Sequence, residues 1–306
     1  MKHYSVLKEE AINGLNIHED GVYVDATLGY AGDSSEILKR ITKGKLFAFD
    51  RDQEAIFYSE EVLKKIGNNY QIIHSDFVDM KEKLLELGVT KVDGILFDLG
   101  VSSPQLDENR GFSFMREENL DMRMDQSESL SAFDVVNNYS YEQLRDIFYQ
   151  YGEEKRSSFI ASKIVSERQK KQIKTTTELT DIIKSAVGAK YYYKTHPERN
   201  IFQAIRIEVN HELDDLKKVL PEAISLLKPG GRLVVITFHS LEDRIVKQIF
   251  KKYSEVDKMV NGLPEIPKEF APLIRLVNKK PILPSEEELK ENSRSASAKL
   301  RIIERI

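Results

Sequence analysis

The chain has 306 residues, no cysteine and a formal net charge of −4, and this composition excludes several classes of protein. Without cysteine there is no disulfide framework, no thiolate nucleophile and no Cys-ligated metal site. Charged residues make up 31% and hydrophobic residues 41% of the chain, which indicates a globular protein, either one large domain or one domain carrying an insertion. The sequence lacks both a signal-peptide-like start and a run of about 20 apolar residues, so we expect a cytoplasmic protein.

The first hundred residues alternate β-rich runs with helical patterns, which is typical of βαβ units in a parallel sheet. The predicted strands cover residues 21–25, 45–50, 70–74 and 92–98. The predicted helices between them cover residues 33–41, 55–66 and 80–87. We expect Asp33 to begin the first helix, where its carboxylate would accept from backbone amides and Glu36 would reach back, as in a capping box.

The alternation of strands and helices breaks after residue 99. Residues 100–125 are rich in turn formers and have no helical period, whereas residues 140–190 are helical throughout, with a capping box predicted at Thr175 and Glu178. A longer helix follows from Asn200, and Pro229-Gly230-Gly231 predicts a stop. Afterwards the predicted elements are a strand, a helix and two further strands, over residues 232–238, 241–253, 274–277 and 300–304.

This pattern predicts a helical block inserted between the fourth and fifth strands of a doubly wound sheet. We place the first part of the sheet domain at residues 1–106, the helical insertion at residues 107–200 and the second part at residues 201–306.

Polar or glycine residues follow the predicted strands at the edge where open α/β sheets bind ligands. A turn with Gly29 and Gly32 leads into a helix N-terminus, which offers free N–H groups. Asp50 ends the second strand 21 residues after Gly29, where a carboxylate can accept from two ribose hydroxyls. Phe77 follows the third strand and would pack on an adenine, and Asp98 ends the fourth. Each feature has a plainer alternative: a tight turn, a solvated acid or a core aromatic.

A series of motifs, in a fixed order along the chain, resembles one enzyme family. The motifs are DLGVSSPQLD (98–107), RGFSF (110–114), LDMRMD (120–125), YGEE (151–154), FQAIRIEVNHEL (202–213), PGGRL (229–233) and FHSLEDR (238–244). Together they are similar to the bacterial 16S ribosomal RNA cytosine-N4 methyltransferases, which use S-adenosyl-L-methionine. The resemblance runs nearly end to end. It implies an α/β class I methyltransferase fold, a Rossmann-like sheet with an inserted all-helical substrate domain, and it favours this cofactor over a nicotinamide.

The resemblance also implies which residues bind the methyl donor. The positions that match are Ala31, Gly32, Asp33, Asp50, Phe77, Asp98 and Gln105. One of them departs from the family, whose turn usually ends in Gly-His, whereas this chain has Gly32-Asp33. A carboxylate there is favourable beside the donor's ammonium or sulfonium and unfavourable beside its carboxylate. We interpret Asp33 as a helix cap that contacts the donor through its backbone.

Two side chains are candidates for catalysis. A cytosine amine is a poor nucleophile, so positioning and acceptors for its protons are needed. The Ser102 hydroxyl and the backbone carbonyl before Pro104 are candidate acceptors, and His239, just past the fifth strand, is a candidate proton acceptor. The alternative is that Ser102 shapes a turn and that His239 is structural, as a lone histidine more often is. No cluster of His, Asp and Glu predicts a metal site.

Basic residues are concentrated in one segment. Residues 151–200 hold eleven Lys and Arg against six acidic residues, a net charge of +5 against −9 for the rest. This distribution is typical of a domain that grips RNA phosphates. The run Tyr191-Tyr192-Tyr193 would stack on unpaired bases. The alternative interpretation is a solvated helical face with packed tyrosines.

The resemblance implies a substrate and partners. It implies N4 methylation of a decoding-region cytosine in 16S rRNA within the small ribosomal subunit, with no membrane partner and with a homodimer as an option. Two alternatives stay open. One is an amino-methyltransferase acting on DNA or another RNA, and the other is a non-catalytic ribosome assembly factor.

Overall fold

The computed structural model describes residues 5–101, 109–256, 258–260, 267 and 270–306. The chain divides into a sheet unit, residues 1–100 with 213–306, and a helical unit, residues 101–212. Each unit has a hydrophobic core of its own. The boundaries therefore differ from the predicted positions after residues 106 and 200. Helix α11 (Pro197–Asn210) lies in the helical unit because it buries Ile201, Phe202 and Ile205 in that unit's core.

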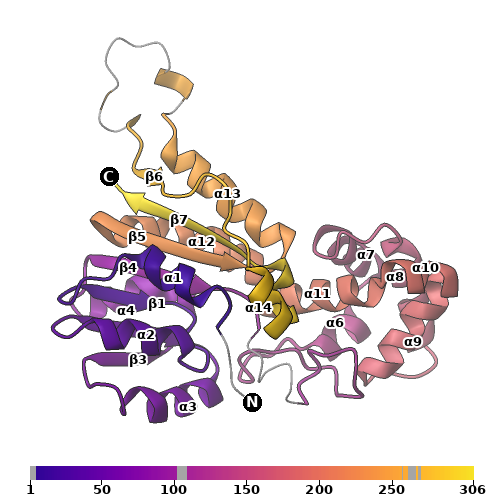
Figure 1. Cartoon of the computed structure of the whole chain (residues 1–306). Coiled ribbons are helices and arrows are strands. Elements are labelled where there is room, and N and C mark those ends of the chain that lie inside the picture. Colours follow the sequence, from indigo (N-terminus) through magenta and orange to yellow (C-terminus); the bar gives the residue numbers. More distant parts are fainter. Residues whose placement is uncertain (1–4, 102–108, 257, 261–266, 268–269) are drawn as a thin grey trace. The chain divides into compact units, whose positions relative to one another are not determined.

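The sheet unit contains a seven-stranded sheet of order β3-β2-β1-β4-β5-β7-β6 among its described residues (Figure 1). Its strands are β1 (Val22–Asp25), β2 (Lys45–Asp50), β3 (Tyr70–His74), β4 (Val92–Asp98), β5 (Leu227–Thr237), β6 (Ile274–Leu276) and β7 (Lys299–Arg305). Strands β1 to β5 pair in parallel, and β7 runs antiparallel to both β5 and β6. The predicted doubly wound sheet is confirmed, and its carboxyl edge brings together the ends of β1, β2 and β4.

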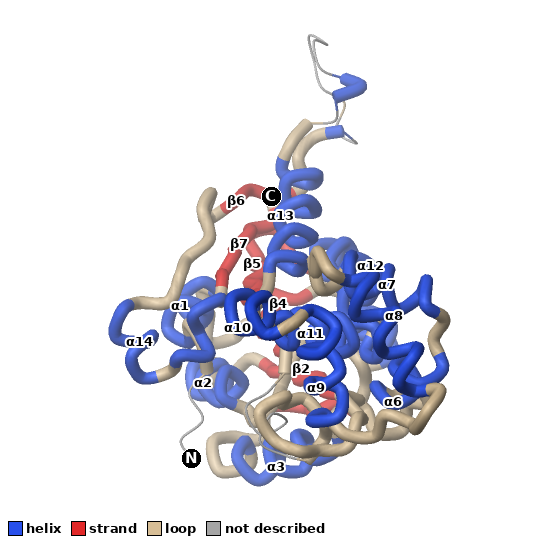
Figure 2. The backbone as a smooth tube through the Cα atoms, turned by 90° about the vertical axis from the view of Figure 1, so that its right-hand side faces the viewer, coloured by secondary structure: helices blue, strands red, loops and turns tan. Residues whose placement is uncertain are grey.

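Helices cover both faces of this sheet. They are α1 (Lys8–Leu15), α2 (Gly32–Arg40), α3 (Gln53–Leu63), α4 (Met80–Glu86), α12 (Glu212–Leu226), α13 (Ser240–Ser254) and α14 (Glu286–Glu291). Helices α1 and α2 lie on one face and α12 and α13 on the other (Figure 2). The apolar run of β4, Ile95 to Phe97, is therefore buried, as expected for a parallel strand covered on both sides. None of the described helices is long and apolar enough to cross a membrane.

The helical unit is built from short amphipathic helices around one core. They are α6 (Ala132–Asn138), α7 (Tyr141–Gln150), α8 (Ser157–Arg168), α9 (Thr176–Val187), α10 (Ala189–Thr195) and α11. The capping box predicted at Thr175 and Glu178 is present at the start of α9. A second capping box, between Ser131 and Asp134, starts α6, a helix that the sequence interpretation did not include.

Two predicted details of the sheet unit are wrong. Helix α2 begins at Gly32 after Ala31, which has a φ of 61°, and no side chain caps it. Asp33 is thus inside the first turn, and Glu36 contacts Lys39 and Lys8 instead of closing a capping box. The predicted strand start at residue 232 is also wrong, because β5 begins at Leu227, although the preceding helix does end before Pro229, at Leu226, as predicted.

Candidate functional site

The turn between β1 and α2 is held in place by β2 and α3. The Leu28 N–H donates to the Phe49 carbonyl at 2.8 Å, and the Ser59 hydroxyl donates to the Gly29 carbonyl at 2.8 Å. Ala31 adopts a left-handed conformation that is unfavourable for a residue with a Cβ, so the turn depends on these anchors. A Cβ on Gly32 would collide with the Ser5 hydroxyl, so a larger residue would displace the Ser5 side chain from this close approach.

Asp50 fastens the same turn to the end of β2. Its Oδ2 accepts from the Gly29 N–H at 2.8 Å and its Oδ1 accepts from the Asp52 N–H at 2.8 Å. Burial raises the pKa of Asp50 to about 6, although both hydrogen bonds act to lower it. Each oxygen keeps a second lone pair that can accept from a ligand hydroxyl, so the predicted ribose contact is compatible with this geometry.

Three acidic side chains form an acidic cluster: Asp25 at the end of β1, Asp98 at the end of β4 and Asp33 in the first turn of α2. Asp25 and Asp33 are buried, and Asp98 is half-buried with its Oδ1 atom enclosed. Asp25 accepts from the Ser34 hydroxyl at 2.6 Å and from the Thr27 N–H at 3.1 Å. The Thr27 hydroxyl in turn accepts from the Asp98 N–H at 2.7 Å. Thr27 thereby joins the ends of the two strands, and Ser34 joins them to the first turn of α2.

The acidic cluster is electrostatically unsatisfied. Burial, opposed by hydrogen bonds, raises the pKa of Asp25; burial and the nearby Asp25 raise that of Asp33 to about 7. Burial, then Asp33 and Asp25, raise the pKa of Asp98 well above its usual range. No Lys, Arg or His in the described part of the chain forms an ion pair with any of the three. The Oδ1 atoms of Asp33 and Asp98 are buried without a hydrogen-bond partner among the described residues. Because such acceptors cost free energy, they mark where a ligand's N–H or O–H groups fit.

Two predicted residues for methyl-donor binding remain, Phe77 and Gln105, and the structure describes only Phe77. Phe77 lies in the 3₁₀ turn η1 (Phe77–Asp79) after β3, half-buried, with its ring edge-on to Phe97 at a centroid distance of 5.6 Å. It packs on the core and still has an accessible part. Gln105 lies outside the described residues, as do the proposed acceptors at Ser102 and before Pro104.

His239 forms the N-cap of α13. Its Nδ1 accepts from the Glu242 N–H at 3.5 Å, and its Nε2 lies 3.1 Å from the Glu242 carboxylate. That carboxylate also accepts from the N–H groups of Phe238 and His239, which completes a capping box. An Nδ1 that accepts places the proton of the neutral ring on Nε2. These contacts are structural, and a catalytic role for His239 stays a prediction.

Two arginines in the basic segment have structural roles in the helical unit. The Arg156 guanidinium donates to the Val187 carbonyl at 2.8 Å and lies over the Tyr191 ring at 4.1 Å. Arg168 donates to the carbonyls of Val136 and Tyr139 at 2.8 and 2.5 Å. These two arginines are therefore already engaged within the protein, and the count of eleven basic residues overstates the charge available for RNA phosphates.

Three lysines between α8 and α9 are exposed. Lys170 pairs with Glu167 at 2.9 Å and Lys171 with Glu178 at 2.6 Å, whereas the Lys174 ammonium has no partner in the described part of the chain. Ion pairs between exposed side chains contribute little, so a phosphate can compete with these glutamates.

The tyrosine run is only partly accessible. The Tyr191 hydroxyl donates to Glu154 at 2.7 Å, and both Tyr191 and Tyr192 pack against the core of the helical unit. Tyr193 is 62% exposed, and its hydroxyl accepts from Lys184 at 2.8 Å. The predicted stacking on bases is therefore limited to Tyr193.

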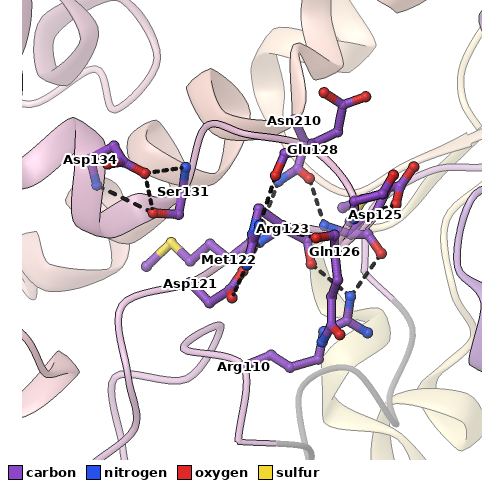
Figure 3. Close-up of polar contacts among 12 residues, drawn as sticks. Arg110, Asp121, Met122, Arg123, Asp125, Gln126, Glu128, Ser131, Asp134 and Asn210 are labelled. Atoms are coloured by element: carbon purple, nitrogen blue, oxygen red, sulfur yellow. Dashed lines mark hydrogen bonds and ion pairs between the residues drawn. The ribbon is translucent and has the colours of Figure 1, made fainter.

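The segment from residue 110 to residue 134 forms a polar network that the sequence interpretation did not predict (Figure 3). Arg110 donates to the Arg123 carbonyl at 2.7 Å, Arg123 pairs with Asp121 at 2.8 Å, and Asn210 donates to the Met122 carbonyl at 2.8 Å. The motifs RGFSF and LDMRMD supply most of these residues. A pocket of about 430 Å³ adjoins the network, lined by Asn119, Leu120, Asp121, Arg123, Ser129, Ser131, Phe133, Asp134 and Lys174.

Comparison with known proteins identifies a family. Residues 1–306 match the model of the MraW methylase family. A candidate rRNA methylase from Clostridium thermocellum aligns over 100% of both chains with 12% identity and a TM-score of 0.46. An rRNA methylase from Streptococcus thermophilus aligns over 98% of this chain and 93% of its own with 11% identity and a TM-score of 0.42. A candidate methyltransferase from Streptococcus mutans in complex with SAH aligns over 100% of both chains with 12% identity and a TM-score of 0.43.

Proposed function

The chain belongs to the MraW methylase family, and from this premise we propose that it methylates the N4 amine of cytosine 1402 in the decoding region of 16S rRNA. Its methyl donor is S-adenosyl-L-methionine. The proposed substrate is the small ribosomal subunit, or a late precursor of it, in the cytoplasm. Naked RNA is not the proposed substrate.

The residues at the sheet edge fit this methyl donor. The two buried oxygens without partners, on Asp33 and Asp98, accept from the polar groups of its methionyl end. Helix α2 has no side-chain cap, so its N-terminus is open to that end as well. Asp50 would hold the ribose and Phe77 the adenine. When bound, the donor supplies a methyl group on a sulfonium leaving group.

The protein's part in the reaction is positioning and proton acceptance. The Ser102 hydroxyl and the carbonyl before Pro104 would accept hydrogen bonds from the amine N–H groups, which would help the nitrogen to pyramidalise and present its lone pair for attack. His239 can accept a proton only at Nδ1, because Nε2 carries the proton of the neutral ring. That nitrogen now faces the Glu242 N–H at 3.5 Å, a long hydrogen bond that is easily given up.

One observation carries the proposal for the sheet unit: the carboxyl groups of Asp25, Asp50 and Asp98 lie at the ends of β1, β2 and β4. A fourth, that of Asp33, lies in the first turn of α2, a helix whose N-terminus has no side-chain cap. This is the place where an open α/β sheet binds a nucleoside-like ligand. The exposed lysines of the helical unit support the proposal that the substrate is RNA.

A methylation assay tests the function. Purified protein and labelled S-adenosyl-L-methionine are incubated with 30S particles, free 16S rRNA and DNA, and N4-methylcytosine is mapped in 16S rRNA from cells with and without the protein. We expect transfer to the small subunit and loss of one modified cytosine in cells without the protein. Transfer to DNA or another RNA would overturn the substrate, and donor binding without transfer to any nucleic acid would indicate an assembly factor.

A further inference from the structure

Asp33 is a buried carboxylate whose side chain does not cap the helix on which it lies. It occupies the first turn of α2, is 6% exposed, and interacts with the Ser5 hydroxyl. Its Oδ1 has no hydrogen-bond partner among the residues that the structure describes, and the same holds for Asp98 Oδ1. Lys8 on the neighbouring helix α1 acts on Asp33 through its charge, but its ammonium lies 3.8 Å from Glu36 and forms no ion pair with the acidic cluster. Within the described part of the chain, the two open oxygens therefore have neither a hydrogen-bond donor nor an ion-pair partner.

We propose that Asp33, together with Asp98, binds the α-ammonium group at the methionyl end of the methyl donor. This inference rests on the proposed methyl-donor site and does not depend on which base is methylated. Asp33 would then be a specificity-determining residue, because it recognises the amino-acid part of the ligand by charge.

The chemistry of the ligand selects this group. An ammonium has three N–H donors and a positive charge, so it can satisfy both open oxygens at once. The sulfonium carries no N–H and leaves the acceptors unsatisfied. The carboxylate of the same ligand would be repelled by three acidic side chains. The adenosine part is uncharged and gives the acidic cluster no counter-ion.

The proposal predicts that ligand binding depends on pH. The charged groups that face Asp33 are Asp25 on β1, Asp98 on β4, Lys8 on α1 and Glu36 on α2; Glu242 of α13 acts on Asp98. An ammonium pairs with the ionised carboxylate, and the free protein holds the pKa of Asp33 at about 7. Protonation therefore competes with binding at low pH, and affinity falls about tenfold between pH 8 and pH 6.

Calorimetry with two ligands tests the inference without any turnover. S-adenosylhomocysteine carries the α-ammonium, and 5′-methylthioadenosine has the same adenosine and thioether without the amino-acid end. We expect Asp33→Asn to weaken binding of S-adenosylhomocysteine about tenfold and binding of 5′-methylthioadenosine less than twofold. Glu36→Gln removes an acid one turn further along α2 and serves as the matched control, with both affinities unchanged.

Each outcome decides the question. An Asp33→Asn variant that binds S-adenosylhomocysteine as the wild type does, or a wild-type affinity that does not change between pH 6 and pH 8, overturns the inference and leaves the methyl-donor site intact. Equal losses for both ligands show that the substitution distorts the turn, which also overturns it. Wild-type protein that binds neither ligand rejects the methyl-donor site itself, and the inference with it. Circular dichroism confirms that the variants are folded.

Discussion

Asp50 binds two backbone N–H groups before any ligand arrives, and this shapes the effect of removing it. We expect Asp50→Ala to weaken binding of S-adenosylhomocysteine by roughly 1.5–3 kcal/mol, about 10- to 150-fold. A charge-assisted hydrogen bond to ribose is lost, and the turn at Gly29 loses its anchor. Calorimetry measures the change, and an unaltered affinity would exclude Asp50 from the site. Asp52→Ala is the matched control, since Asp52 caps α3 and its loss lowers stability alone.

Asp33 also makes the stability of the ligand-free protein depend on pH. The pKa of this carboxyl group is about 7 in the folded chain against 3.8 for the free side chain, chiefly because of burial. The folded state therefore binds the proton more tightly, so ionisation of Asp33 destabilises the fold progressively from about pH 4 to pH 7. Asp33→Asn removes this charge. We expect it to raise the melting temperature by about 2 °C or more at pH 8 and by much less at pH 5. Equal shifts at both pH values would contradict the assignment.

At the scale of elements, substitutions of His239 at the start of α13 can distinguish its role as a helix cap from its proposed role in catalysis. Asparagine is a strong N-cap residue, so His239→Asn should keep the melting temperature close to that of the wild type. His239→Ala should lower the free energy of unfolding by about 0.5–2 kcal/mol because the cap is lost. If Nδ1 of His239 accepts the proton, the Asn variant binds the substrate normally and turns over about a hundredfold more slowly. Normal turnover in that variant would show that His239 acts only as the N-cap of α13 and has no catalytic role.

The predictable elements are those whose signals are local and strong. Strands β1 to β4 lie where the β-rich runs predicted them. For β1, β2 and β4 the reason is that strands buried on both faces need continuous apolar residues, whereas β3 is a half-buried edge strand. The start of α2 was not predictable in this way. Its sequence Asp33-Ser34-Ser35-Glu36 matches a capping pattern, but contacts from β2 and α3 fix the preceding turn and start the helix earlier. Helix α6 could have been predicted from the capping box of Ser131 and Asp134, but the helix has only seven residues and so shows little helical periodicity.

The candidate site was predictable in position but not in detail. Parallel topology places the ends of β2 and β4 at one edge, so Asp50 and Asp98 could be found from spacing alone. The membership of Asp25 in the acidic cluster could not be predicted from the sequence, because it depends on hydrogen bonds from Ser34 and Thr27 that form only in the folded protein. Burial likewise removed Tyr191 from the residues available to RNA, which a residue count cannot show.

At the scale of the whole molecule, two units with separate cores hold the proposed methyl-donor site and the proposed RNA contact. All described candidate residues for methyl-donor binding lie in the sheet unit, and the exposed lysines lie in the helical unit. If the helical unit binds RNA, reversing the charge of Lys170, Lys171 and Lys174 to Glu should weaken binding to the small subunit at low salt. The loss should shrink as salt rises, because each contact with a phosphate releases counter-ions. Affinity for S-adenosylhomocysteine should not change.

Filter binding at several salt concentrations measures this effect, and the logarithmic salt slope should fall by about two to three for three lost contacts. Reversal of Lys247, Lys251 and Lys252, which are exposed along the second half of α13, is the control of equal charge in the sheet unit. Tyr193→Ala offers a second comparison, since stacking depends less on salt than phosphate contacts do. If the triple variant of the helical unit binds the subunit normally at low salt, its lysines are only a solvated surface. Recognition would then have to come from elsewhere, and residues 111–125, beside the pocket of the helical unit, are the next candidates.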